Sequence, residues 1–184
     1  MTTNRSVLSR EDIMRGATQH FLSHATLDMD LLARELVVSR ATLYRAVGSR
    51  DKLLGDVFGA VSRWLFQNAR VRVGPLSGPD DVIAITRTYL EMLEQANAFR
   101  TFLREDPQVA SRVIFTTAGN VQQRSVEEQT EIFREAGLTG DDLGRRAFLY
   151  VRIVESVLFA ELLGAGQMFL ADAEPSLRAL LFRA

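Results

Sequence analysis

The stretch that most constrains the fold is residues 27–54, LDMDLLARELVVSRATLYRAVGSRDKLL. Asp28 can cap a helix, because its carboxylate can accept hydrogen bonds from early backbone N–H groups. Three apolar residues then follow at the spacing of one helix face: Leu31, Leu32 and Leu36. The β-branched pair Val37 and Val38 ends this run, and Ser39 can cap another helix. The pattern predicts two short helices joined by a tight turn.

The predicted second helix, residues 40–47, divides into core and surface positions. The residues that can serve a core are Ala41, Leu43 and Val47. The polar residues displayed outward are Arg40, Thr42, Tyr44 and Arg45. Arginine can bind guanine bidentately, hydroxyls can bond phosphates or base edges, and a helix N-terminus attracts phosphate. Such a surface suits DNA.

A third helix is expected directly after this pair. Gly48 ends the preceding helix and Ser49 can cap the next one, which has Arg50 and Lys52 in its first turn. Cations at that end oppose the helix dipole, so we expect them to serve an outside anion. The predicted DNA contacts are therefore Ser39, Arg40, Thr42, Tyr44, Arg45, Arg50 and Lys52.

These residues resemble the DNA-binding motif of the TetR-type bacterial transcriptional repressors. The matching segments are Leu32-Ala33, Val37-Val38-Ser39, Thr42-Leu43-Tyr44 and Ser49-Arg50-Asp51-Lys52-Leu53. Val37 replaces the usual turn glycine, and Asp28 replaces a hydroxyl residue that often caps the first helix and touches a phosphate. The resemblance implies a regulator that binds double-stranded operator DNA as a homodimer and responds to a small-molecule effector. The structural alternative is a helical hairpin that only packs.

Composition and charge frame this interpretation. The chain has 184 residues, 47% of them hydrophobic, and no cysteine, which excludes disulfides and cysteine-ligated zinc. The start, MTTNRSVLSRED, lacks an apolar secretory core, and no apolar run is long enough for a bilayer, so we expect a cytoplasmic protein without membrane contact. Residues 1–70 carry ten Lys or Arg against seven Asp or Glu, while the remainder carries twelve against sixteen. The positive excess lies with the motif.

The chain is expected to be all-α, because no convincing period-two strands appear. We predict an N-terminal helix-turn-helix domain over residues 1–52, joined by a long helix to an antiparallel helical effector and dimerisation domain over 53–184. Helices are expected at 9–23, 49–70, 80–96, 98–104, from Pro107 to an interruption at Gly119, at 120–136, at 141–163, and from Pro175 onward.

The expected helix 141–163 is apolar on nearly every side, so both faces must be covered. We assign one stripe to a twofold dimer interface: Tyr150, Val154, Val157, Leu158 and Glu161. The other stripe places charges within an apolar wall: Arg152, Glu155, Ser156 and Phe159. Two interpretations remain open for it. The charges form an internal ion pair that fixes helix packing, or they line an effector cavity.

Further effector-site candidates have weaker support: Trp64, Tyr89, Phe99 and Gln122. The three aromatic residues are more typical of a simple core. The segments REDPQVASRV, GNVQQR and YVRIVESVLFAELLGAG resemble the effector domain of the QsdR group of TetR-type repressors, by general pattern and without an invariant chemical motif. That resemblance implies a lactone or related acyl effector.

Catalysis and cofactors are not expected. His20 and His24 have a metal-ligand spacing, but no third ligand motif accompanies them, so we interpret both as surface residues near a helix end. No nucleophile elbow, P-loop or dinucleotide fingerprint is present. The alternative function is a helical protein that binds a partner or ligand without specific DNA binding, which Val37 and Asp28 favour.

Overall fold

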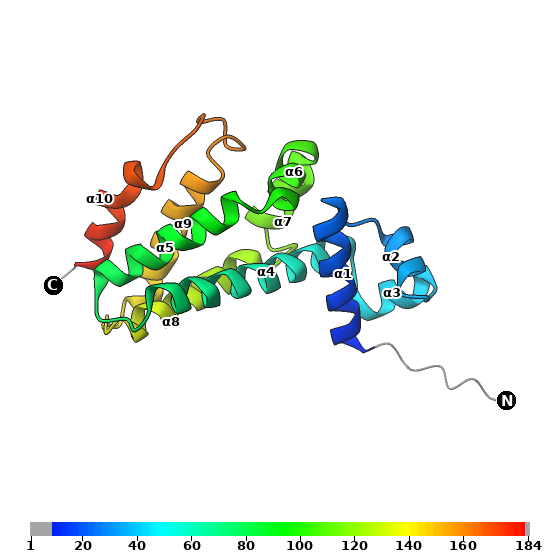
Figure 1. Cartoon of the computed structure of the whole chain (residues 1–184), viewed down its shortest axis with the longest axis horizontal. Coiled ribbons are helices and arrows are strands. Elements are labelled where there is room, and N and C mark those ends of the chain that lie inside the picture. The colour runs from blue at the N-terminus through cyan, green and yellow to red at the C-terminus, as the bar shows by residue number, and fades with distance from the viewer. Residues whose placement is uncertain (1–8, 183–184) are drawn as a thin grey trace. The chain divides into compact units, whose positions relative to one another are not determined.

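The structure is a computed structural model that describes residues 9–182. Within these residues it contains ten α-helices and no strand, so the all-α prediction is confirmed (Figure 1). The helices are α1 (Arg10–His24), α2 (Met29–Glu35), α3 (Arg40–Val47), α4 (Arg50–Val73), α5 (Pro79–Glu94), α6 (Asn97–Glu105), α7 (Pro107–Phe115), α8 (Val121–Glu135), α9 (Leu143–Leu158) and α10 (Leu170–Leu181).

Within residues 9–182, every helix is too short or too polar to span a bilayer. The first eight residues of the N-terminal segment that we judged unlike a secretory leader lie outside the described part of the chain.

The predicted helix starts are confirmed at the caps. The Ser9 hydroxyl accepts the Asp12 N–H at 3.1 Å in a reciprocal capping box. The Asp28 carboxylate accepts the N–H groups of Asp30 and Leu31 at 2.8 and 3.0 Å. Ser39 accepts the Thr42 N–H at 3.1 Å. Each cap satisfies N–H groups that have no partner within their helix, so the sequence determines these boundaries locally.

The turn between α2 and α3 has Schellman geometry. The Val38 N–H donates to the Ala33 carbonyl at 3.0 Å, and the Val37 N–H donates to Arg34 at 3.1 Å. This geometry requires a left-handed residue, and Val37 adopts it with φ of 55°. The position where the family pattern has glycine is thus one where a positive φ is needed.

Contacts divide the chain into two units. The first contains the residues up to Phe58 together with Ala98–Asn120, and the second contains Gly59–Asn97 together with the residues from Val121 onward. Helix α4 contributes to both, and α6 and α7 group with the helix-turn-helix motif. The functional boundary that we placed after residue 52 stays a prediction.

The first unit has an aromatic core. Phe21 of α1 and Phe102 of α6 both meet Phe58 of α4 edge to face, with ring centroids 5.2 and 5.5 Å apart. Gly55 of α4 lies against Gly119, so closely that a Cβ on Gly55 would overlap with the Gly119 backbone. Helix α4 therefore packs tightly on the segment after α7.

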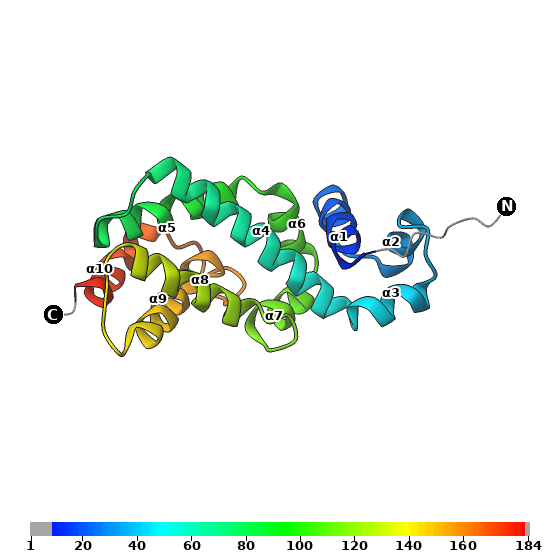
Figure 2. The ribbon, with the colours of Figure 1, turned by 90° about the horizontal axis from the view of Figure 1, so that it is seen from below.

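The second unit is built from the end of α4 and from α5, α8, α9 and α10. Helices α8 and α9 lie side by side, and α10 packs on α9 and α5 (Figures 1 and 2). The Tyr150 hydroxyl lies 2.8 Å from that of Thr86, and its ring meets Phe133 edge to face. A polar group buried with a partner costs little, so this tyrosine can occupy the centre of an apolar core.

Some expectations about helices were wrong. Leu31 and Ala41 are exposed, so these two apolar positions do not serve the core. Helix α9 ends at Leu158, five residues earlier than expected, and turns follow it. Pro175 lies inside α10 and does not open it. Burial of Ala173, Leu177 and Leu181 on one face outweighs the hydrogen bond that proline removes.

Candidate nucleic-acid interface and effector site

The start of α3 carries a connected group of polar side chains. The Ser39 and Thr42 hydroxyl oxygens lie 2.8 Å apart, and Arg45 donates to the Ala41 carbonyl at 3.3 Å. Ser39, Thr42 and Arg45 are all exposed, while Leu43 and Val47 anchor the helix from below. The local fold therefore presents hydroxyl and guanidinium groups outward on a helix whose opposite face is buried.

Arg40 is exposed and has two neighbours that orient it. Its guanidinium forms an ion pair with Asp30 of α2 at 3.1 Å and lies over the Tyr44 ring, 5.4 Å from the centroid. The Tyr44 hydroxyl, followed by the Asp30 charge, raises the pKa of Arg40 above its already high ordinary value. The Arg40 guanidinium, which we predicted to contact DNA, is thus paired with Asp30. The sequence pattern did not indicate this partner.

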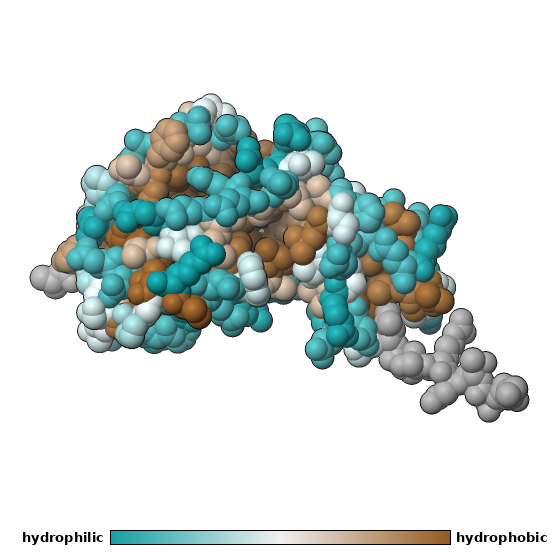
Figure 3. Space-filling model, viewed as in Figure 1, coloured by the Kyte–Doolittle hydropathy of each residue, from teal (hydrophilic) through white to brown (hydrophobic). Residues whose placement is uncertain are grey.

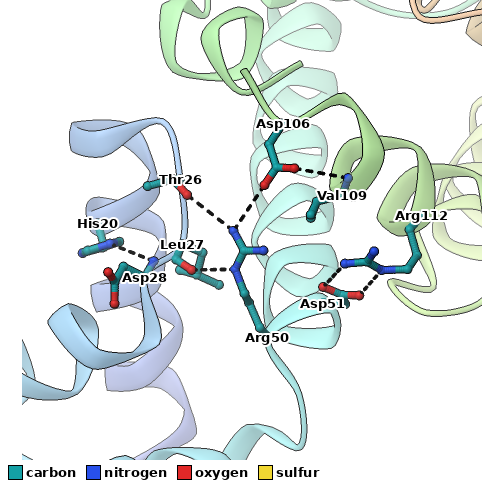
Figure 4. A network of polar contacts seen from close by, with 9 residues as sticks. All are labelled: His20, Thr26, Leu27, Asp28, Arg50, Asp51, Asp106, Val109 and Arg112. Carbon is teal, nitrogen blue, oxygen red and sulfur yellow. Dashed lines mark hydrogen bonds and ion pairs between the residues drawn. The ribbon is translucent and has the colours of Figure 1, made fainter. Parts of the chain in front are cut away.

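The two predicted cations at the start of α4 differ in their surroundings. Lys52 is exposed, and its backbone N–H donates to the capping Ser49 hydroxyl at 3.1 Å. Arg50 instead points toward the loop between α1 and α2, where its Nε donates to the Leu27 carbonyl at 2.8 Å (Figure 4). An open pocket of about 340 Å³ is lined by residues of the α1–α2 loop and of α2, α3 and α4, among them Asp28, Arg40, Tyr44 and Arg50.

His20 is buried, which corrects the surface position that we assigned to it. Its Nδ1 lies 2.8 Å from Glu35 Oε2, and its Nε2 accepts the Asp28 N–H at 3.3 Å (Figure 4 draws the second bond). The His24 ring stacks on it with centroids 4.5 Å apart. His20, His24 and Glu35 are close enough together to hold a metal ion. Because both His20 nitrogens already have partners, hydrogen bonding between α1 and α2 accounts for this cluster.

In the second unit, the predicted charged pair is formed on α9. Arg152 donates to Glu155 Oε2 at 2.7 Å, and Gln122 of α8 donates to the same oxygen at 3.4 Å. The Glu155 side chain is only 9% exposed, compared with 38% for Arg152. Burial raises the pKa of the Glu155 carboxyl, and the Arg152 charge opposes that rise without cancelling it. The group therefore combines a buried carboxyl with guanidinium and amide donors.

The remaining predicted effector residues are dispersed. The Tyr89 hydroxyl lies 3.1 Å from that of Ser62, its ring stacks on Phe66, and burial raises its pKa to about 12. Trp64 is 58% exposed. Phe99 packs on Phe58 within the first unit.

Two further predicted effector residues lie at the end of α9. The Ser156 hydroxyl donates to the Ile153 carbonyl at 2.7 Å, and Phe159 is buried just beyond the helix. Figure 3 shows that apolar and polar surface alternate on the face in view.

The predicted dimer stripe is mostly internal. Tyr150 and Val157 are buried, Val154 packs against the same core, Leu158 is half-buried, and Glu161 is exposed beyond the helix end. The large apolar residues that α9 exposes are Phe148 and Leu149, at 45% and 44%. Sequence reasoning missed this pair, because a helix that is apolar on both faces gives no signal for which face lies inside one protomer.

Comparisons with known proteins agree with this architecture. The family model for the tetracyclin repressor-like C-terminal domain matches residues 77–182, more than half of the chain. A solved structure of the Rhodococcus erythropolis (R. erythropolis) transcriptional repressor QsdR, of the TetR family, is similar, with a TM-score of 0.85 and 28% sequence identity. The match covers 94% of this chain and 93% of that one. No curated protein matches. The chain belongs to the TetR family of transcription regulators.

Proposed function

We propose that this protein binds a near-palindromic operator as a homodimer in the cytoplasm and is released by a small-molecule effector. The observation that carries the DNA-binding part is the polar group on α3, which consists of the exposed Ser39, Arg40, Thr42 and Arg45 and the half-buried Tyr44. Lys52 adds a cation on the next helix. A helix of this kind suits the major groove, and a twofold dimer places two of them at half-sites about 34 Å apart.

Dimerisation through α9 is supported by the exposed Phe148 and Leu149. These two residues are adjacent on α9 and about half exposed, and burial of their remaining apolar surface against a second copy is favourable. The proposed interface therefore uses this pair and not the buried Tyr150.

The proposed effector site centres on Glu155, Arg152 and Gln122. Ligand sites commonly combine apolar walls with a few polar anchors, and this group can hydrogen-bond a carbonyl inside an otherwise apolar region. Similarity to QsdR and the pattern of α9 lead us to propose a lactone or related acyl compound. For release, the effector must bind the DNA-incompetent arrangement more tightly, with a coupling of about 1–3 kcal/mol.

The DNA-binding proposal is tested by the affinity of the purified protein for DNA upstream of its own gene and for a scrambled fragment, across a salt series. We expect preferential, salt-sensitive binding to the native fragment. Tyr44→Phe combined with Arg45→Gln should remove the preference while the circular dichroism spectrum stays unchanged. If native and double-variant proteins bind both fragments equally and weakly, the chain is better described as a helical partner- or ligand-binding protein.

The effector proposal is tested with γ-lactones of increasing acyl length, using fluorescence of the single tryptophan and release from operator DNA. We expect saturable binding that lowers operator affinity and is weakened by Glu155→Ala. Ligands that bind without changing operator affinity would contradict the release mechanism.

A further inference from the structure

Arg50 connects three segments of the first unit. Its Nε donates to the Leu27 carbonyl at 2.8 Å, and its Nη2 lies 3.4 Å from the Thr26 hydroxyl and 3.7 Å from Asp106 Oδ2. Leu27 and Thr26 belong to the loop between α1 and α2, whereas Asp106 precedes α7 (Figure 4). We call Arg50, Thr26, Leu27 and Asp106 the Arg50 network.

Asp106 also contacts the first turn of α7. Its Oδ1 accepts the Val109 N–H at 3.4 Å and so caps α7. One turn further along, Arg112 of α7 forms a two-pronged ion pair with Asp51 of α4, at 2.6 and 3.3 Å. The Arg112 side chain lowers the pKa of Asp51, as expected for a carboxylate held by a guanidinium. Helix α7 is therefore tied to the start of α4 by two arginine–carboxylate contacts, one at its cap Asp106 and one at Arg112 in its last turn.

The Arg50 network also acts on the helix-turn-helix motif. Leu27 directly precedes Asp28, the cap of α2, and the Asp28 N–H is held by His20. Helix α2 in turn packs on α3, which carries the proposed DNA contacts. Fixing the Leu27 carbonyl thus restrains the start of α2 and, through it, the orientation of α3.

We propose that Arg50 is a positioning residue for operator binding and not a phosphate contact. With Asp106, it holds α2 and α3 in the orientation that binds DNA, so that α7 is a structural part of the DNA-binding unit although it lies within the match to the C-terminal domain model. This inference rests on the proposed DNA-binding function. It assigns α7 as the element whose attachment to the motif sets operator affinity.

The direction in which Asp106→Asn changes DNA affinity distinguishes positioning from simple electrostatics. Asp106→Asn preserves the helix cap, because asparagine caps as well as aspartate, but removes the charge that faces Arg50. Electrostatics alone predicts tighter DNA binding when an acid is lost, since DNA is anionic. Positioning predicts weaker binding, by about 3- to 30-fold.

The matched control is Asp30→Asn. Asp30 is an exposed acid of the same unit that pairs with Arg40 on the proposed DNA-contacting face. Its removal frees a DNA-contacting guanidinium and should raise operator affinity. Opposite effects of Asp30→Asn and Asp106→Asn support the proposal, and tighter binding by both overturns it.

The salt dependence gives a second distinction. Lys52→Gln should reduce the slope of log affinity against log salt by about 1.8 for the dimer, because each protomer loses one phosphate contact worth about 0.9. Arg50→Gln should lower affinity while leaving this slope unchanged. An equal loss of slope in Arg50→Gln would identify Arg50 as a phosphate contact and overturn the proposal.

A measurement without DNA completes the test. Hydrogen exchange at residues 28–32 should be faster in Asp106→Asn than in the native protein, with α8 and α9 unaffected. Unchanged exchange at the start of α2 would contradict the proposal. Failure of the native protein to bind any DNA would instead remove the proposed function itself, and the positioning role with it.

Discussion

Val37 is the residue whose type least suits the backbone conformation that it adopts. It has a φ of 55°, is 85% exposed and completes the Schellman turn between α2 and α3. A left-handed conformation costs an L-residue roughly 1–2 kcal/mol, and β-branching makes it less favourable. No contact of an 85%-exposed side chain offsets a cost of that size. The turn is therefore formed by the helices on either side of it, against the preference of its central residue.

Replacing Val37 by glycine should stabilise the protein. Val37→Gly removes the conformational energy that valine loses at a positive φ. The greater backbone entropy of glycine in the unfolded chain offsets part of this stabilisation, so the free energy of unfolding should rise by about 0.5–1 kcal/mol. Urea unfolding followed by circular dichroism measures this change. Val38→Gly is the control, because Val38 has no positive φ and its replacement should lower stability. Equal destabilisation by both would refute the explanation.

Glu155 gives stability a particular pH dependence. Burial raises its pKa in the folded state above the ordinary value of 4.5. The folded state therefore holds the proton more tightly than the unfolded state, and stability is lost as pH rises from about 4.5 through the higher folded pKa. Glu155→Gln removes this titration. The free energy of unfolding of Glu155→Gln, relative to that of the native protein, should therefore be larger at pH 7 than at pH 4.5. Urea unfolding at both pH values tests this difference. A difference that is constant with pH would contradict the account.

At the scale of elements, the anchoring of α10 depends on one buried arginine. The Arg146 side chain is 6% exposed, and its guanidinium donates to the carbonyls of Leu180, Leu181 and Thr139 at 2.9–3.2 Å. The last carbonyls of a helix have no partner within it, so this guanidinium satisfies the end of α10 and ties it to α9.

Loss of the Arg146 guanidinium should lower the free energy of unfolding. Arg146→Ala leaves the buried Leu181 carbonyl and the part-buried carbonyls of Leu180 and Thr139 without their guanidinium donor, and we expect the free energy of unfolding to fall by about 1–3 kcal/mol. Arg145→Ala is the control, because Arg145 is the neighbouring arginine on the same helix and is exposed. Thermal unfolding of both variants decides the matter, and equal midpoints would show that the carbonyl contacts contribute little.

The elements differ in how far their sequence determines them. Helix starts at Ser9, Asp28 and Ser39 were predictable, because a capping side chain acts within three residues of itself. The continuation of α10 through Pro175 was not, because burial against α9 and α5 decides it. The residues of the candidate site differ in predictability for the same reason. The outward residues of α3 follow from local periodicity, whereas the inward turn of Arg50 depends on the α1–α2 loop and on Asp106, far away in the sequence.

At the scale of the whole molecule, the proposed function requires two copies. Each protomer carries one α3, and a palindromic operator offers two half-sites, so affinity depends on linking two weak contacts. Phe148 and Leu149 are the apolar side chains that α9 leaves exposed for such a link.

A charge in this pair should separate the protomers. Leu149→Arg places a cation in the proposed interface, so sedimentation should change from dimer to monomer and operator affinity should fall on the order of 100-fold. Val71→Arg is the matched control, because Val71 is an exposed apolar residue of α4 outside the proposed interface. A Leu149→Arg protein that remains dimeric would place the interface elsewhere.

The central claim, that α3 reads a twofold-symmetric operator, is tested most directly by selecting DNA from a random library with the native protein and with Arg45→Ala. The account predicts that the native protein enriches a palindromic sequence with half-site centres about 10 base pairs apart, and that Arg45→Ala loses preference at one base pair of each half-site. Enrichment of no sequence by the native protein, or of the same sequence by both proteins, would contradict it.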